Sequence, residues 1–231
     1  MNYLIILIVL VVFSIILAII YDVNIKKFET YAKNEEKRLN SKIDKYPSNK
    51  EICTQMLRKI NNNNVKIEEN KDSKTCLYIA VTNKIIIADV KNSYTRIQTI
   101  AHECLHSKQN RKILLFNFIF SNIYFMYFAL IAVLAIFKII KNGMLYINIM
   151  LFLSYVYYFV RSYLENDAMI KARYLSEEYM KETKILQESD VEEITKSYDE
   201  INKRGIKIVN YNLMFGTILK VILLDFIFFI R

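Results

Sequence analysis

The sequence predicts a mainly α-helical membrane protein with about four transmembrane helices and a small α+β part outside the bilayer. Hydrophobic residues make up 54% of the chain, although 24% of it is charged. The apolar residues gather in four blocks separated by lysine-rich segments, which is typical of a multi-pass membrane protein. Between the first two blocks, isoleucine and valine follow a strand-like spacing, which indicates a short sheet.

The distribution of charge along the chain predicts five segments and their orientation. Lysine and arginine are dense in two of the segments, and the positive-inside rule places both in the cytoplasm with the N-terminus outside. The first apolar block has no basic region before it and no small-residue cleavage site, so we expect a retained anchor. The segments are an N-terminal anchor (1–21), a cytoplasmic α+β segment (22–112), a transmembrane hairpin (113–160), a cytoplasmic helical segment (161–212) and a C-terminal transmembrane helix (213–231).

Many of the basic residues that give the chain its net charge of +9 lie next to the apolar blocks. This placement favours contact with lipid head groups over nucleic acid, because no basic run is interleaved with aromatic residues on a soluble surface. The cysteines Cys53, Cys76 and Cys104 are unevenly spaced, so we expect free thiols in a reducing compartment, with Cys104 in the core. The chain carries no indication of an oligomeric state.

The α+β segment is expected to end in a helix from Tyr94 to Asn110, with Ser93 as its N-cap. An amphipathic helix over residues 22–46 and a second helix after Ser48 come first. Three short strands follow, and the last, Lys84–Ala88, is our candidate edge strand for holding an extended peptide. The alternative places it inside the sheet. The strands are expected at 65–68, 76–81 and 84–88, with a tight turn at Thr82-Asn83.

Both histidines of the chain lie in one motif, His102-Glu103-Cys104-Leu105-His106. Residues four apart share one face of a helix, so both imidazoles can reach a single zinc ion. The intervening glutamate can then act as general base on an activated water molecule. A short sheet directly before such a helix is a recurrent protease arrangement.

The third ligand of a catalytic zinc site must be a carboxylate or a cysteine, since no further histidine exists. Two predicted spans separate the motif from segment 161–212, so both return to the same side of the membrane. Glu165 lies near the start of this second segment and therefore close to the predicted membrane surface, as His106 does at the end of the first. Ala168 and Ala172 on the same side of the helix would permit a close approach to the histidine helix.

The motif residues 99–106, the paired spans and Leu164-Glu165-Asn166-Asp167-Ala168 resemble the YugP-type membrane neutral zinc metallopeptidases. The chain is similar, more distantly, to the HtpX-type and CAAX-processing membrane proteases. This resemblance, over about residues 76–175, implies a metalloprotease-like α+β part of the gluzincin type. It implies that His102, His106 and Glu165 bind zinc and that Glu103 is the base. It also implies that Asp167 orients one of the histidines without itself binding the metal.

The sequence therefore predicts an integral-membrane metalloendopeptidase with one catalytic zinc ion and peptide or protein substrates, some of them membrane-associated. Iron and manganese can use the same ligands, but two imidazoles and a carboxylate favour zinc. Two alternatives stay open: a non-catalytic membrane zinc sensor or signalling module, and a structural protein with an accidental motif. An additional donor to the reacting oxygen has four candidates nearby in the sequence, Tyr94, Tyr163, Arg173 and Tyr174.

Overall fold

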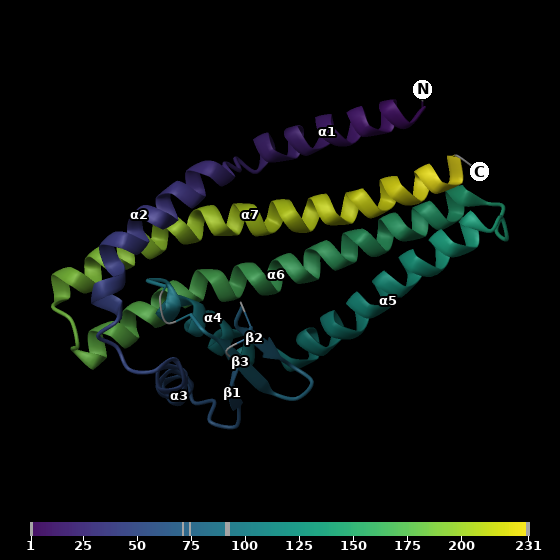
Figure 1. Ribbon diagram of the computed structural model, residues 1–231. Coiled ribbons are helices and arrows are strands. Elements are labelled where there is room, and N and C mark those ends of the chain that lie inside the picture. Colours follow the sequence, from purple (N-terminus) through teal and green to yellow (C-terminus); the bar gives the residue numbers. More distant parts are fainter. Residues whose placement is uncertain (1, 71, 74, 91–92, 230–231) are drawn as a thin grey trace. The chain divides into compact units, whose positions relative to one another are not determined.

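A computed structural model of the chain describes residues 2–229 except 71, 74, 91 and 92. The described part is mainly helical, with one small sheet (Figure 1). The elements are α1 (Asn2–Ile20), α2 (Ile25–Ile43), α3 (Asn49–Lys59), β1 (Lys66–Asn70), β2 (Leu77–Ile79), β3 (Lys84–Ala88), α4 (Arg96–Lys108), α5 (Arg111–Ile136), α6 (Gly143–Thr183) and α7 (Glu188–Phe229).

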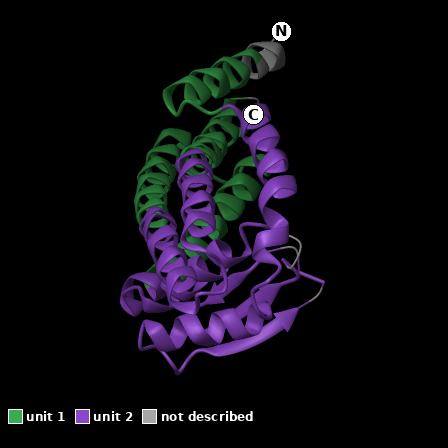
Figure 2. Ribbon diagram, turned by 90° about the vertical axis from the view of Figure 1, so that its left-hand side faces the viewer, with its two compact units in different colours: residues 1–23, 116–163, 207–231 green, residues 24–115, 164–206 purple. Residues whose placement is uncertain are grey.

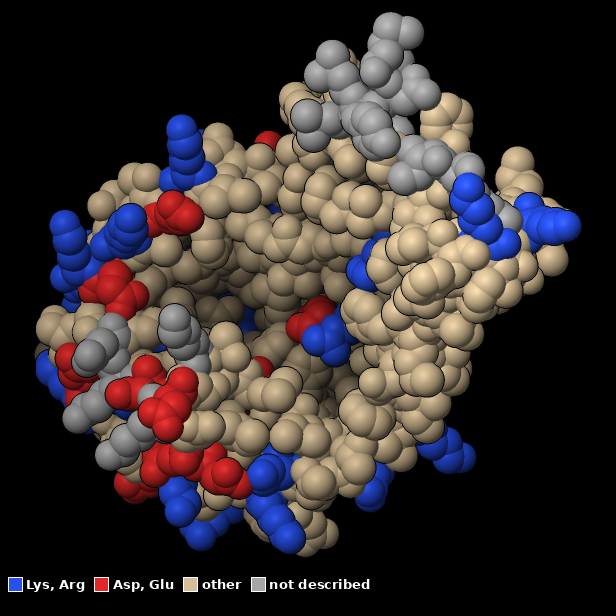
Figure 3. All heavy atoms as spheres, turned by 45° about the vertical axis from the view of Figure 1, so that its right-hand side comes forward, with Lys and Arg blue, Asp and Glu red and all other residues tan. Residues whose placement is uncertain are grey.

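Three helices in the described part of the chain, α5, α6 and α7, are long and apolar enough to cross a membrane. A fourth span exists if Ile8–Ile20 and Ile25–Ile43 count as one span bent by 51°. Of the four spans or so that the sequence predicts, three are thus matched by candidate helices, and the fourth, at the N-terminus, depends on counting the bent pair as one span. On the face seen in Figure 3, wide areas carry only uncharged side chains, and the charged residues form separate groups.

The chain divides into two compact units, which are coloured separately in Figure 2. Unit 1 comprises residues 1–23, 116–163 and 207–231, and unit 2 comprises 24–115 and 164–206. Helices α5, α6 and α7 each run from one unit into the other. The apolar stretch 144–160 and the polar stretch after it, which we expected as separate segments, are therefore parts of one continuous helix, α6.

Unit 1 is held together by apolar packing with a few polar contacts inside it. The ring of Tyr124 is fully buried and stacks on Tyr157, with centroids 4.8 Å apart. Its hydroxyl lies 3.2 Å from that of Ser154. The ammonium group of Lys220 donates to the Gly216 carbonyl and lies 4.9 Å from the ring of Phe125. Each of these polar groups thus has a partner inside the unit, as burial among apolar side chains requires.

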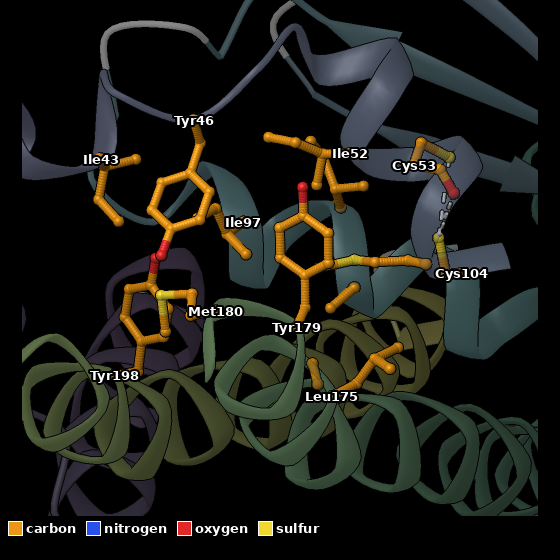
Figure 4. Packing of buried hydrophobic residues seen from close by; sticks show 14 of the residues in the cluster. Ile43, Tyr46, Ile52, Cys53, Ile97, Cys104, Leu175, Tyr179, Met180 and Tyr198 are labelled. Carbon is orange, nitrogen blue, oxygen red and sulfur yellow. Dashed lines mark hydrogen bonds between the residues drawn. The ribbon is translucent and has the colours of Figure 1, made fainter. Parts of the chain in front are cut away.

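Unit 2 has a hydrophobic core to which α2, α3, α4, α6 and α7 contribute (Figure 4). The stripe expected over residues 22–46 is confirmed in part: Leu39 and Ile43 of α2 are fully buried, Phe28 is half-buried, and Tyr46, which follows the end of the helix, is 4% exposed. The Ser48 side chain caps α3 by accepting from the Glu51 amide, as expected. Other members of this core, drawn in Figure 4, are Ile52, Cys53, Ile97, Cys104, Leu175, Tyr179, Met180 and Tyr198.

The sheet has the order β1-β3-β2, with β1 parallel and β2 antiparallel to β3. Our choice of Lys84–Ala88 as the edge strand is therefore wrong, because β3 is the central strand. Both edges of β3 are paired, one with β1 and one with β2, and Ile85 and Ile87, which share one face of the strand, are almost completely buried. The expected turn before β3 is confirmed, with Asn83 in the left-handed region at φ 48°.

The motif helix begins two residues later than predicted. Ser93 is not its N-cap: α4 starts at Arg96, and the capping residue Thr95 makes no side-chain hydrogen bond to the helix. The Ser93 hydroxyl is used within the preceding turn, where it accepts from the Thr95 amide. The local turn therefore competes successfully with a helix cap for this hydroxyl.

Arg96 anchors the start of the motif helix to the connection between α2 and α3. Its guanidinium is 1% exposed and donates to the carbonyls of Ile43, Tyr46 and Pro47 and to the side-chain oxygen of Asn49, at 2.8 to 3.0 Å. These four hydrogen bonds replace the contacts with water that the buried guanidinium has lost.

We predict that Arg96→Met lowers the free energy of unfolding of unit 2 by about 3 kcal/mol, because it leaves buried carbonyls without donors. Thermal unfolding of the detergent-solubilised protein measures this. Arg58→Met is the matched control, since Arg58 is exposed on α3 and its replacement should change stability by less than about 0.5 kcal/mol. Equal stability of the two variants would contradict the anchoring role.

Candidate metal centre

Helix α4 presents its two histidines on one face and its apolar residues on the other. Ile97, Ile100 and Cys104 are buried in the core of unit 2, as the sequence predicts. His102 and His106, four residues apart, come together on the opposite face, where their Nε2 atoms lie 3.0 Å from each other. The helical repeat alone is enough to produce this pairing.

Glu165 of α6 joins the two histidines. Its Oε2 atom lies 3.4 Å from Nε2 of His102 and 3.7 Å from Nε2 of His106. The side chains of the three residues are only 11% to 20% exposed, so the group is sheltered yet open to water. The structure thus brings together the three ligands that the sequence suggested, two from α4 and one from a distant helix.

The spacing of these three donor atoms fits a single metal ion. Donors bound to one tetrahedral zinc ion at its usual bond lengths lie about 3.3 Å from each other. The ligand atoms of His102, His106 and Glu165 all lie within 4.8 Å of one another, and the three shortest separations bracket that value. Two imidazoles and one carboxylate are three protein ligands of the kinds that zinc accepts, and zinc sites with three protein ligands leave a fourth position for water or substrate.

The carboxylate of Glu165 changes the acid–base properties of its neighbour. Burial disfavours the charged imidazolium, but the Glu165 carboxylate, helped by the charge of Glu103, more than offsets this effect. The pKa of His106 is therefore raised above its usual 6.5. The same attraction would draw a metal cation to the site.

Glu103, the predicted base, is held in place by the edge of the sheet. Its Oε2 atom accepts a hydrogen bond from the backbone amide of Tyr78 in β2, at 2.6 Å. The residue is 6% exposed and follows His102 directly on α4. The sequence pointed to the glutamate, but it gave no indication of this amide, because a backbone donor leaves no mark on residue identity.

Asp167 does not reach a histidine directly. Its carboxylate accepts from the Gln109 side-chain amide at 3.0 Å and pairs with the Lys171 ammonium at 2.5 Å. Burial would raise the pKa of Asp167, but these two donors lower it below its usual value. The expected link between Asp167 and a histidine therefore runs through Gln109, a residue that the sequence reasoning missed. Its position three residues after His106, on the same helical face, was the available signal.

The cysteine alternative for the third ligand finds no support in the geometry. Cys53 and Cys104 are fully buried in the core with their sulfur atoms 3.7 Å apart, as free thiols (Figure 4). Burial raises the pKa of Cys76 to about 11, which keeps this thiol protonated at neutral pH. A protonated thiol is a poor metal ligand.

Two of the four candidate donors to the reacting oxygen are committed elsewhere. Tyr94 is buried in the core, where its ring lies 6.0 Å from that of Tyr198. Arg173 forms ion pairs with Glu177 and Asp199. Tyr163 and Tyr174 are exposed, at 59% and 61%.

No family model, curated protein or solved structure matches this chain. The resemblance to membrane zinc metallopeptidases therefore depends on the motif residues and on the convergence of Glu165 with the two histidines.

We predict that Glu165→Ala reduces bound zinc to well below one ion per chain, because two imidazoles alone hold the ion weakly. Metal analysis of the purified protein, before and after dialysis against a mild chelator, measures this. Glu178→Ala is the control, since Glu178 is on the same helix, 60% exposed and paired with Lys59. Full zinc retention in the Glu165 variant would exclude this carboxylate as a ligand.

The raised pKa of His106 predicts how zinc binding depends on pH. A ligating histidine must be neutral, so protons compete with zinc. Because the pKa is raised, protonation of His106 should already have lowered the zinc affinity more than twofold at pH 6.5, the ordinary pKa of histidine. Calorimetric titration with zinc at a series of pH values tests this. Affinity that stays constant down to pH 6.5 would contradict the pairing with Glu165.

Proposed function

We propose that this protein is an integral-membrane, zinc-dependent endopeptidase. The observation that carries the proposal is the meeting of His102, His106 and Glu165 beside a glutamate in the position of a general base. A site that only stored or sensed zinc would need no general base beside its ligands and would close the fourth position.

The proposed arrangement in the membrane follows from hydropathy and charge. Helices α5, α6 and α7 cross the bilayer, with α1 as the N-terminal anchor, and the lysine-rich segments lie in the cytoplasm. The active site then lies on the cytoplasmic face. His106 precedes the first residue of α5, Arg111, by only five positions, so substrates at the membrane surface are within its reach.

The chemistry proposed for the site is hydrolysis of a peptide bond. A zinc ion, when bound, supplies a Lewis acid that polarises the scissile carbonyl and makes water acidic. Glu103 takes a proton from the attacking water and passes it to the leaving amine. The Tyr78 amide holds one oxygen of this carboxylate, which limits its rotation and leaves the other oxygen for the proton.

The edge strand β2 is the place where we propose that an extended substrate binds. It pairs with β3 on one side only, and Tyr78 directs its amide toward the site on the other. The Tyr78 amide is committed to Glu103, so a peptide laid along this side would pair with the other backbone groups of β2. This strand replaces Lys84–Ala88 in that role.

We predict that Glu103→Gln retains zinc and lowers the hydrolysis rate by about 10²- to 10⁴-fold, the range typical for loss of a general base. Hydrolysis of casein and of a membrane peptide, with and without chelator, measures the activity, and metal analysis checks the site. Glu36→Gln is the control, because Glu36 also accepts a backbone amide, that of Tyr94.

A Glu103 variant as fast as the wild type would exclude this residue as the base. Stoichiometric zinc in a wild-type protein that cleaves neither substrate would favour the non-catalytic sensor instead. A metal-free protein from zinc-replete cells would favour the structural alternative.

A further inference from the structure

Gln109 connects three groups around the candidate metal centre with one side chain. Its Oε1 atom lies 2.9 Å from Nδ1 of His106, and its Nε2 atom donates to the Leu164 carbonyl at 2.8 Å and to Asp167 at 3.0 Å. It therefore reaches from the end of α4 to the part of α6 that carries Glu165, some 55 residues further along the chain.

The partners of this amide determine which way round it lies. The Leu164 carbonyl and the Asp167 carboxylate are both acceptors, so the NH₂ end of Gln109 must face them. The carbonyl oxygen is then left for His106. The usual ambiguity between the two ends of a glutamine amide does not arise here.

The orientation of Gln109 in turn fixes the tautomer of His106. An amide oxygen accepts only, so Nδ1 of His106 must carry the proton and donate it. In the neutral ring, Nε2 then has a free lone pair, and this is the atom that faces His102 and Glu165. Metal-ligating histidines generally donate the N–H of their other ring nitrogen to such an acceptor.

The other half of the amide acts on the third ligand. Leu164 and Asp167 lie on either side of Glu165 along α6, so two hydrogen bonds from Gln109 tie this turn to α4. Lys171 holds the Asp167 carboxylate from its other side. The position of Glu165 relative to His106 thus depends on a side chain that is itself no ligand.

We propose that Gln109 is a positioning residue of the metal centre, which fixes the tautomer of His106 and ties the Glu165 turn of α6 to the histidine helix. This inference depends on the proposed zinc site but not on peptide hydrolysis.

A role of Gln109 only in ending the helix can be separated from this one. Its backbone amide caps α4 by donating to the carbonyls of Leu105 and His106. Those bonds survive any substitution except proline, so a side-chain variant leaves the cap in place. Whatever such a variant loses belongs to the amide group.

The test compares Gln109→Met, which removes both functions of the amide, with Gln109→Glu, which keeps an acceptor for His106 and loses both donors. Gln55→Met is the matched control, because Gln55 also links a neighbouring helix, α3, to α6 by accepting from the Tyr179 hydroxyl. Zinc affinity is measured by competition with a chromophoric chelator. The tautomer is read from ¹⁵N NMR of the metal-free protein at alkaline pH, where only two histidines contribute signals.

We expect Gln109→Met to bind zinc about 10- to 100-fold more weakly than the wild type, the usual effect of removing a partner behind a ligand. It should also lose the Nδ1–H preference of His106. Gln109→Glu should keep that preference and still bind zinc more weakly. Gln55→Met should match the wild type in both measurements.

Unchanged zinc affinity in Gln109→Met, or an equal loss in Gln55→Met, would overturn the proposal. A wild-type protein that binds zinc tightly and hydrolyses nothing would end the endopeptidase proposal and leave the role of Gln109 intact. A wild-type protein that binds no zinc would overturn both.

Discussion

The convergence of one carboxylate with two imidazoles is the interaction on which the candidate site depends. Glu165 approaches both histidines from a separate helix, and its negative charge raises the pKa of His106. A buried carboxylate beside two nitrogen donors is costly to desolvate unless it is paired. Protons or a metal cation can supply that compensation, and a divalent cation does so for all three groups at once.

The surrounding fold keeps these groups in place. Helix α4 is fixed at its start by the buried guanidinium of Arg96, and along its length by the core of unit 2. Near its end, the Asn62 amide donates to the Ser107 carbonyl, and Gln109 ties the same end to α6. Helix α4, which carries both histidines, is thereby held at its start, along its length and at its end.

Much of this arrangement follows from local sequence patterns. The helical repeat places His102 and His106 together, and the position of Glu165 after two apolar blocks led us to expect it beside them. The strands were close to their predicted bounds, but their order was not predictable, because the parallel pairing of β1 with β3 depends on non-local contacts. The roles of Gln109 and of the Tyr78 amide were not predicted for a different reason, because hydrogen bonds between polar groups leave no periodic pattern in the sequence.

The histidine pair and Glu165 differ in the contacts that the chain must form to bring them into place. The edge strand and both histidines lie within residues 77–106, so short-range contacts suffice to assemble them. The carboxylate arrives only after the chain has passed through α5 and turned back along α6, at the entropic expense of closing a long loop. A newly made chain whose helical hairpin has not yet formed therefore holds the two histidines without the third member of the group, Glu165.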